Sequence, residues 1–314
     1  MNHLVNRRDF LQQSGSLAAL AALTPVCSRA VEPFRRPGKP RLLTSIAAYS
    51  FREHFIDSSH RRSQQIAAKD RISLFDFIDY CADQGCAGTE LTGYYFPESI
   101  SEAFLLKIKR HAYLRGIAIS GTAVGNSFTH APGPKRTEQL DHVKRWIDYA
   151  QVMGAPHIRV FAGSKGELSH KEAVRNCIRG LEACGDYAAE RGIFLGIENH
   201  GGIVAEADPL IEIVRAIDSP WIGINLDTGN FHTDDPYGDL ERCAPYAVNV
   251  QLKVEIRPRG QKQKTKSDLG RLFAILRKAN YQGFVVLEHE AAEDPWTTIP
   301  AYLAEMNGHI AAGA

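Results

Sequence analysis

The sequence predicts a single-domain α/β protein with the (β/α)8 TIM barrel fold, and three observations support this. From residue 41 onward, short apolar segments alternate with longer segments of helical periodicity, and eight such pairs follow one another. The short segments are almost continuously apolar, which is typical of parallel strands covered on both faces. No glycine-rich dinucleotide fingerprint follows any of them, so a closed barrel is favoured over a doubly wound sheet.

The elements can be assigned in order along the chain. Strands are predicted at residues 42–50, 88–91, 117–124, 156–161, 193–198, 221–227, 247–253 and 283–288. Helices are predicted at residues 73–84, 101–115, 137–153, 170–191, 209–217, 238–244, 267–279 and 295–309, where apolar residues recur at helical spacing. Every strand is therefore followed by one helix, as the barrel requires.

Two long connections follow predicted strands. Residues 52–71 come after the first strand and residues 257–266 after the seventh, and both are rich in basic side chains. Loops of this length on the catalytic face of a barrel often act as lids, and their charge indicates an anionic substrate or product. Solvated basic loops are the simpler interpretation of the same pattern.

The first thirty residues are not expected to belong to the barrel. Arg7 and Arg8 precede a small, alanine-rich apolar run at 14–23, and this arrangement resembles a twin-arginine export signal. Residues 1–30 are therefore predicted as the signal peptide, residues 31–40 as a linker and residues 41–314 as the barrel domain. Export to the periplasm without a stable membrane anchor after processing is expected, although a membrane-anchoring amphipathic helix would also explain the pattern.

Composition restricts the class of partner. The chain has 314 residues, of which 44% are hydrophobic, and it carries 37 basic against 36 acidic side chains. The apolar fraction is sufficient for a large core, and the charge balance leaves no basic excess for binding nucleic acid. A small molecule is the expected partner.

Oxygen-bearing side chains stand at the carboxyl ends of four predicted strands: Glu198, Asp227, Gln251 and Glu288. Active sites of barrels lie at this end of the strands. Helix capping explains one or two such residues, but four on successive strands indicate a metal site.

The motifs around these residues resemble those of a known family. Residues 197–202 (IENHGG), 226–230 (LDTGN), 250–253 (VQLK) and 286–288 (VLE) look like successive signatures of the xylose-isomerase-like barrel superfamily. That superfamily includes sugar phosphate isomerases and epimerases, ketose 3-epimerases and inosose dehydratases. The resemblance implies one divalent ion, with Mn²⁺ expected first and Mg²⁺ or Co²⁺ as alternatives, bound by Glu198, Asp227, Gln251 and Glu288.

Gln251 departs from the usual pattern of the epimerases, which have His at this position. An amide there resembles the 3-dehydroshikimate dehydratases of the same superfamily. An amide oxygen is a harder donor than imidazole and favours magnesium or manganese over zinc. Isomerisation and elimination therefore both stay open.

The predicted activity is that of a metal-dependent isomerase or epimerase of a ketose or keto-sugar. A divalent ion that chelates a carbonyl and the adjacent hydroxyl would stabilise an enediolate. By analogy with the related epimerases, Glu198 and Glu288 are predicted to remove and return the proton. The alternatives are a lyase or dehydratase of a keto-sugar or of a 3-dehydroshikimate-like keto-acid, and a non-catalytic sugar-binding barrel.

Four flanking residues are predicted to bind substrate. His200 and His232 follow ligand positions closely, Lys253 shares a strand face with Gln251, and Glu90 ends the second strand. Turn capping is the alternative for both histidines, and helix capping is the alternative for Glu90. Pairing with another carboxylate is the alternative for Lys253.

Two basic residues lie on one face of the predicted fourth strand. His157 and Arg159 alternate inward on the fourth strand, where a buried structural ion pair is expected.

The expected partner is a carbohydrate and not a nucleic acid, because the abasic-site endonucleases of the superfamily need several metals and many His ligands. Pairing of two copies through the barrel helices is common in the family, so a homo-oligomer is compatible with the resemblance.

Overall fold

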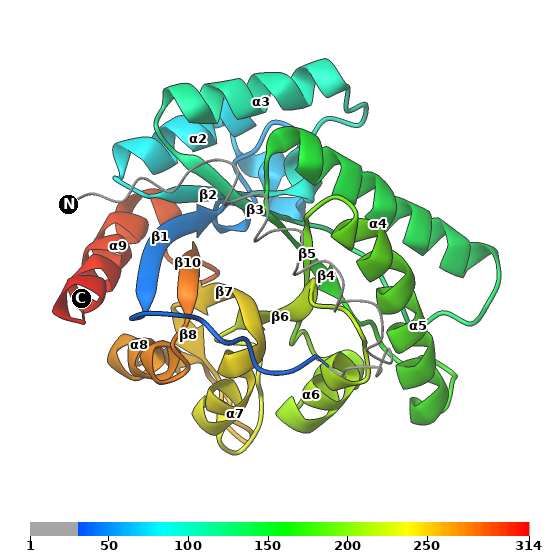
Figure 1. Ribbon diagram of the computed structural model, residues 1–314. Helices are drawn as coiled ribbons and strands as arrows, with labels where there is room; N and C mark the ends of the chain where they lie inside the picture. The colour runs from blue at the N-terminus through cyan, green and yellow to red at the C-terminus, as the bar shows by residue number, and fades with distance from the viewer. Residues whose placement is uncertain (1–30, 314) are drawn as a thin grey trace, which may run out of the picture.

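The computed structural model describes residues 31–313, and eight parallel strands form a closed barrel in it (Figure 1). The strands are β1 (Arg41–Ala47), β2 (Gly88–Thr92), β3 (Ala118–Ala123), β4 (His157–Phe161), β5 (Phe194–Glu198), β6 (Ile222–Asp227), β7 (Ala247–Lys253) and β10 (Gln282–Glu288). Each of these eight strands pairs with the one before it and the one after it in this order, and β1 pairs with β10 to close the ring. The predicted fold is confirmed.

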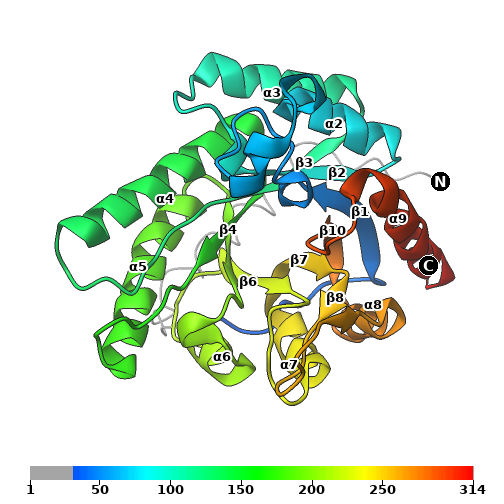
Figure 2. The same ribbon diagram turned by 180° about the vertical axis from the view of Figure 1, so that it is seen from behind.

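Helices surround the barrel on the outside (Figures 1 and 2). They are α2 (Leu74–Asp83), α3 (Glu102–Leu114), α4 (Pro134–Met153), α5 (His170–Ala189), α6 (Ala207–Arg215), α7 (Pro236–Cys243), α8 (Leu269–Lys278) and α9 (Pro295–Ala312). Local sequence explains where several begin. Ser73 and Ser169 form capping boxes with acids three residues later, and Pro134 opens α4 at a position where its missing N–H costs nothing.

Strand register brings the predicted site residues to one end of the barrel. Asp227 on β6 is level with Gln251 on β7, and Glu288 on β10 is level with Lys253 on β7. Residues two apart on a strand share a face, so Gln251 and Lys253 both face the barrel interior at successive levels. The four strand ends β5, β6, β7 and β10 are therefore adjacent.

The segment 31–40, predicted as a linker, lies against the opposite end of the barrel. The Val31 amide donates to the Ile217 carbonyl at 3.1 Å, and the Phe34 amide donates to the Pro245 carbonyl at 3.0 Å. Both acceptors precede strands, so this segment crosses the amino ends of β6 and β7. It leaves the carboxyl ends open.

The connections show more local structure than the sequence predicts. The predicted first strand ends early, because residues 48–51 form a 3-10 turn, η1 (Ala48–Phe51). The loop 257–266 is held by a small antiparallel pair, β8 (Glu255–Ile256) and β9 (Thr265–Lys266).

The predicted export signal, residues 1–30, lies outside the described residues, so export stays a prediction. Within residues 31–313, none of the helices is long and apolar enough to cross a bilayer.

Candidate active site

The acids predicted at the strand ends are almost completely shielded from solvent. Glu198, Asp227 and Glu288 expose 3%, 0% and 4% of their surfaces. Carboxylates are rarely buried to this degree unless cations or hydrogen bonds compensate them. The partners of each carboxylate therefore define the site.

Lys253 lies among three carboxylates. Its Nζ is 2.8 Å from Glu288 Oε2 and 3.5 Å from Asp227 Oδ2, and it also contacts Glu290. Burial by itself lowers the pKa of Lys253, but the surrounding carboxylates raise it well above its usual value, Asp227 most strongly. The amine is therefore a permanent positive charge at the centre of the site.

Glu198 has a different set of partners. Its Oε2 is 2.8 Å from Arg159 Nε, and its Oε1 accepts a hydrogen bond of 2.9 Å from Asn230 Nδ2. Burial raises the pKa of Glu198 to about 7, Arg159 opposes this shift, and the charge of Glu288 adds to it. The guanidinium of Arg159 is fixed in turn by a 2.8 Å bond from Nη1 to the Val124 carbonyl.

Gln251 is held in a network of buried amides with Asn225 and Asn249. Its Oε1 accepts from Asn225 Nδ2 at 2.6 Å, and its Nε2 donates to Glu90 Oε1 at 3.1 Å. Asn249 Nδ2 completes the network, with bonds of 2.8 Å to Asn225 Oδ1 and 3.3 Å to Glu90 Oε2. The Gln251 oxygen thus faces Asn225 and not the three carboxylates.

Glu90 belongs to this inner network and not to the open mouth of the barrel. It is completely buried, and burial raises its pKa to about 8. A role for Glu90 in binding substrate stays a prediction. Its contact with the amide of Gln251 gives it a role in holding that side chain.

The two histidines lie outside the carboxylate group. His200 is exposed, and its ring packs on Phe161 with the centroids 4.4 Å apart. His232 is also exposed, and its Nδ1 is 3.0 Å from the Arg257 carbonyl, so it holds the loop after β7. Contact of either ring with substrate stays a prediction.

Three residues of the site were not assigned to it from sequence. Arg159 was expected to form a buried structural ion pair, and its partner is Glu198 of the site. Glu290 contacts Lys253, and its position two residues after Glu288 was the available signal. Asn230 stands in the turn after β6, and its place at the end of the 226–230 motif was the available signal.

The donor set fits a hard divalent cation in charge and in chemistry. Asp227 Oδ2 is buried and accepts no hydrogen bond from the described residues. Among residues 31–313, the buried cations that pair with the four carboxyl groups Glu198, Asp227, Glu288 and Glu290 are Lys253 and Arg159. Carboxylate and amide oxygens are the donors that Mg²⁺ and Mn²⁺ prefer.

The side chains do not yet form a coordination shell. Within residues 31–313, no group of three His, Cys, Asp or Glu side chains is arranged to hold a metal ion. Ligation by the predicted set would require Gln251 to turn its oxygen away from Asn225, and Lys253 to withdraw from Asp227 and Glu288 toward Glu290. The ligand assignment therefore stays a prediction.

A cavity of about 510 Å³ with balanced charge adjoins the site. The first long loop contributes Arg52, Glu53, His60, Arg61 and Arg62 to its lining, and Glu255 and Glu290 also line it. The Arg52 guanidinium donates to the His289 carbonyl at 3.1 Å. The long loop predicted as a lid therefore lies beside Glu290, which contacts Lys253.

Comparison with known proteins places this geometry in a family. The family described as "Xylose isomerase-like TIM barrel" matches residues 78–306. The 3-oxo-isoapionate decarboxylase of Pectobacterium atrosepticum is 25% identical over 185 residues, which are 58% of this chain and 61% of that protein.

Solved structures share the fold at low identity. A xylose isomerase domain protein from Planctomyces limnophilus superposes with a TM-score of 0.65 at 16% identity, over 88% of this chain and 99% of that one. The 3-keto-D-glucoside 4-epimerase of E. coli superposes with a TM-score of 0.62 at 16% identity, over 86% of this chain and 100% of that one. Identity this low shows a common fold only.

Proposed function

The chain belongs to the xylose isomerase-like TIM barrel family, and on that premise we propose that it is a metal-dependent isomerase or epimerase of a keto-sugar. The observation that carries the proposal is the pair Glu198 and Glu288. These two buried carboxyl groups come from β5 and β10, and each is fixed by a different cation, Arg159 or Lys253. Two carboxyl groups held independently can act on two sides of one substrate carbon.

The residues of the site would have different roles in the reaction. One glutamate removes the proton next to the carbonyl, and the other returns it to the opposite face or to the adjacent carbon. Lys253 and Arg159 hold these carboxylates in place and balance their charge. A divalent ion bound by Glu198, Asp227, Gln251 and Glu288 would supply a Lewis acid for the substrate carbonyl.

A lyase acting on an anionic keto-acid is the second candidate. Arg52, Arg61 and Arg62 line the cavity beside Glu290 and could bind a carboxylate, although Glu53, Glu255 and Glu290 balance their charge. The name of the curated relative, a decarboxylase of a 3-oxo acid, agrees with a substrate that carries both a carbonyl and a carboxylate. Release of CO₂, or a new conjugated enone absorbance, would identify this activity.

The proposed function is tested by metal content and by solvent exchange. The mature protein is expected to contain about one Mn²⁺, Mg²⁺ or Co²⁺ per chain and to incorporate solvent deuterium into a keto-sugar. Asp227→Ala should lose both properties, whereas Asp218→Ala, an exposed acid before β6, should keep both. Glu288→Gln should bind sugar but exchange deuterium about 10²- to 10⁴-fold more slowly.

Two results would count against the proposal. Metal that is retained by Asp227→Ala would mean that the ion is held elsewhere. A wild-type protein that binds keto-sugars without any exchange would be a binding protein on this scaffold.

A further inference from the structure

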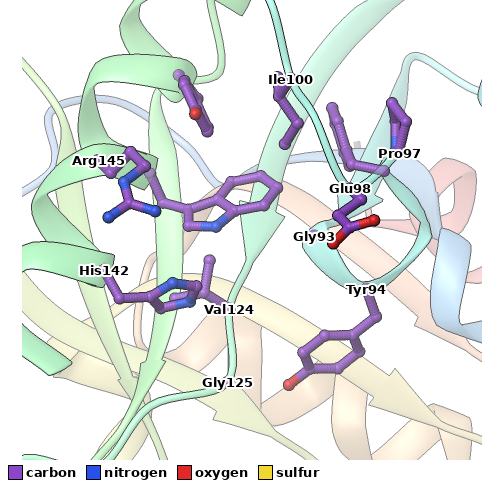
Figure 3. Close-up of a pocket in the computed structure, with 12 residues that line it drawn as sticks. Gly93, Tyr94, Pro97, Glu98, Ile100, Val124, Gly125, His142 and Arg145 are labelled. Atoms are coloured by element: carbon purple, nitrogen blue, oxygen red, sulfur yellow. The ribbon is translucent and has the colours of Figure 1, made fainter. Parts of the chain in front are cut away.

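A second cavity, of about 400 Å³, opens at the carboxyl ends of β2 and β3, between the turn η4 (Gly93–Tyr95) and helix α4 (Figure 3). Val124, which directly follows β3, and the indole of Trp146 line it. His142 and Arg145 lie on one side of this cavity, and Tyr94 and Glu98 lie on the other (Figure 3). A cavity of this size matches ordinary small-molecule sites.

The aromatic wall of the cavity is fixed by close packing. The Trp146 ring meets Phe96 edge-to-face with the centroids 5.1 Å apart, and it meets Tyr149 at 5.5 Å. A Cβ at Gly93 would lie 2.7 Å from a ring carbon of Trp146, and a Cβ at Gly125 would lie 3.2 Å from the Tyr94 hydroxyl. The two glycines therefore allow the rings to approach the backbone closely, and the cavity is preformed.

Tyr94 connects this cavity to the candidate active site. Its hydroxyl accepts a hydrogen bond of 3.4 Å from Arg159 Nη1. The same guanidinium places Nε 2.8 Å from Glu198 Oε2. Tyr94 thus lines the cavity and also contacts the group that binds Glu198.

The polar groups around the cavity are available to a ligand. Within residues 31–313, His142, Arg145 and Glu98 have no ion-pair or hydrogen-bond partner through their side chains. Burial lowers the pKa of His142, and Arg145 adds to this shift, so the neutral ring can both donate and accept. One Arg and one Glu together give no net charge, which suits a neutral polyhydroxyl ligand better than a phosphate or a carboxylate.

We propose that this cavity is a subsite for a second sugar ring, so that the substrate is a glycoside whose keto-sugar ring reacts at Glu198 and Glu288. The inference rests on the proposed function for the location of the reacting ring. The C–H face of a sugar packs on Trp146 and Tyr94, while Arg145, His142 and Glu98 bind its hydroxyls. Residues of this cavity would then select glycosides over free monosaccharides.

The experiment measures binding, which does not require turnover. Cellobiose, maltose and sucrose are each titrated against glucose by calorimetry with the metal-loaded protein. At least one disaccharide should bind more tightly than glucose. Arg145→Met should weaken the binding of that disaccharide about tenfold and leave the binding of glucose unchanged, because a charge-assisted hydrogen bond is lost only in the subsite.

Arg136→Met is the matched control, because Arg136 lies on the same helix and does not line the cavity. Three results would overturn the inference. The first is that no disaccharide binds more tightly than glucose, and the second is that Arg145→Met weakens the binding of glucose and disaccharide equally. The third is that Arg145→Met weakens the binding of a phenyl glucoside but not of any disaccharide. Failure of the proposed function would be recognised separately, because the protein would then show no deuterium exchange whether or not it binds disaccharides.

Discussion

Lys253 is the residue on which the charge balance of the strand ends most depends. It contacts Asp227, Glu288 and Glu290, and it exposes only 7% of its surface. A cation in this position stabilises buried carboxylates, but it also lies where a divalent ion would approach Asp227 and Glu288. The lysine and the ion are therefore expected to compete for the same oxygens.

Replacing Lys253 by Met tests this competition. Lys253→Met should bind Mn²⁺ more tightly than the wild type, because the ion no longer competes with the lysine amine for Asp227 and Glu288. Without metal, the same variant should be less stable by about 3 to 5 kcal/mol, because carboxylates are left uncompensated. Free Mn²⁺ measured by electron paramagnetic resonance and thermal unfolding in EDTA provide the two readouts.

Lys264→Met is the control for that experiment, since Lys264 is exposed and its ion pair within residues 31–313 is with Glu255, at 3.9 Å. Weaker Mn²⁺ binding by Lys253→Met would contradict the expected competition. It would show that the lysine supports the ion and does not displace it.

At the scale of elements, strand β4 packs against its neighbours through an uncharged histidine. A Cβ at Gly121 on β3 would lie 2.9 Å from His157 Nδ1, and a Cβ at Gly196 on β5 would collide with Nε2. Glycine at both positions therefore makes room for the ring inside the barrel. Neither ring nitrogen has a hydrogen-bond partner among the described residues, so a proton on the ring would have no acceptor.

This packing predicts a loss of stability in acid. Burial lowers the pKa of His157 to about 3, and Arg159 adds to the shift, whereas an unfolded histidine titrates near 6.5. Below pH 6.5 the unfolded chain binds a proton that the folded chain does not, so stability is lost as the pH falls toward 3. The cost at pH 5 is about 2 kcal/mol.

Thermal unfolding of wild type and His157→Gln at pH 7 and pH 5 measures this effect. The melting temperature of the wild type should fall more between the two pH values than that of the variant. Equal changes in the two proteins would show that His157 does not contribute to the acid sensitivity.

At the scale of the whole molecule, the candidate site joins strands that are far apart in the sequence. Glu198, Asp227 and Glu288 belong to β5, β6 and β10, and β10 closes the barrel by pairing with β1. An ion bound by all three would connect these strands in the folded state only. Binding of this kind stabilises the fold by mass action.

Metal removal should therefore lower the stability of the whole barrel. Mn²⁺ at one hundred times its dissociation constant should add about 2.7 kcal/mol, which corresponds to a rise of several degrees in melting temperature. EDTA should reverse the rise, and Asp227→Ala should not respond to either reagent. An equal response of wild type and variant would place the stabilising ion outside the predicted site.

The fold and the positions of the strand-end acids were predictable from the sequence. The alternation of apolar strands with helical segments is a local property, and it determines a parallel barrel because such strands must be covered on both faces. The acids that follow the strands are brought to one end by the same rule. Strand alternation also predicted that Gln251 and Lys253 share a face.

Only the tertiary structure determined which side chains meet. Arg159 pairs with Glu198, Gln251 turns toward Asn225, and Lys253 lies among three carboxylates. These partners are 26 to 39 residues apart in the sequence, and long side chains have several rotamers that the strand pattern does not distinguish. Charge and hydrogen bonding in the closed barrel select one of them, so the sequence alone determined which groups reach the site, and packing decided how they are paired.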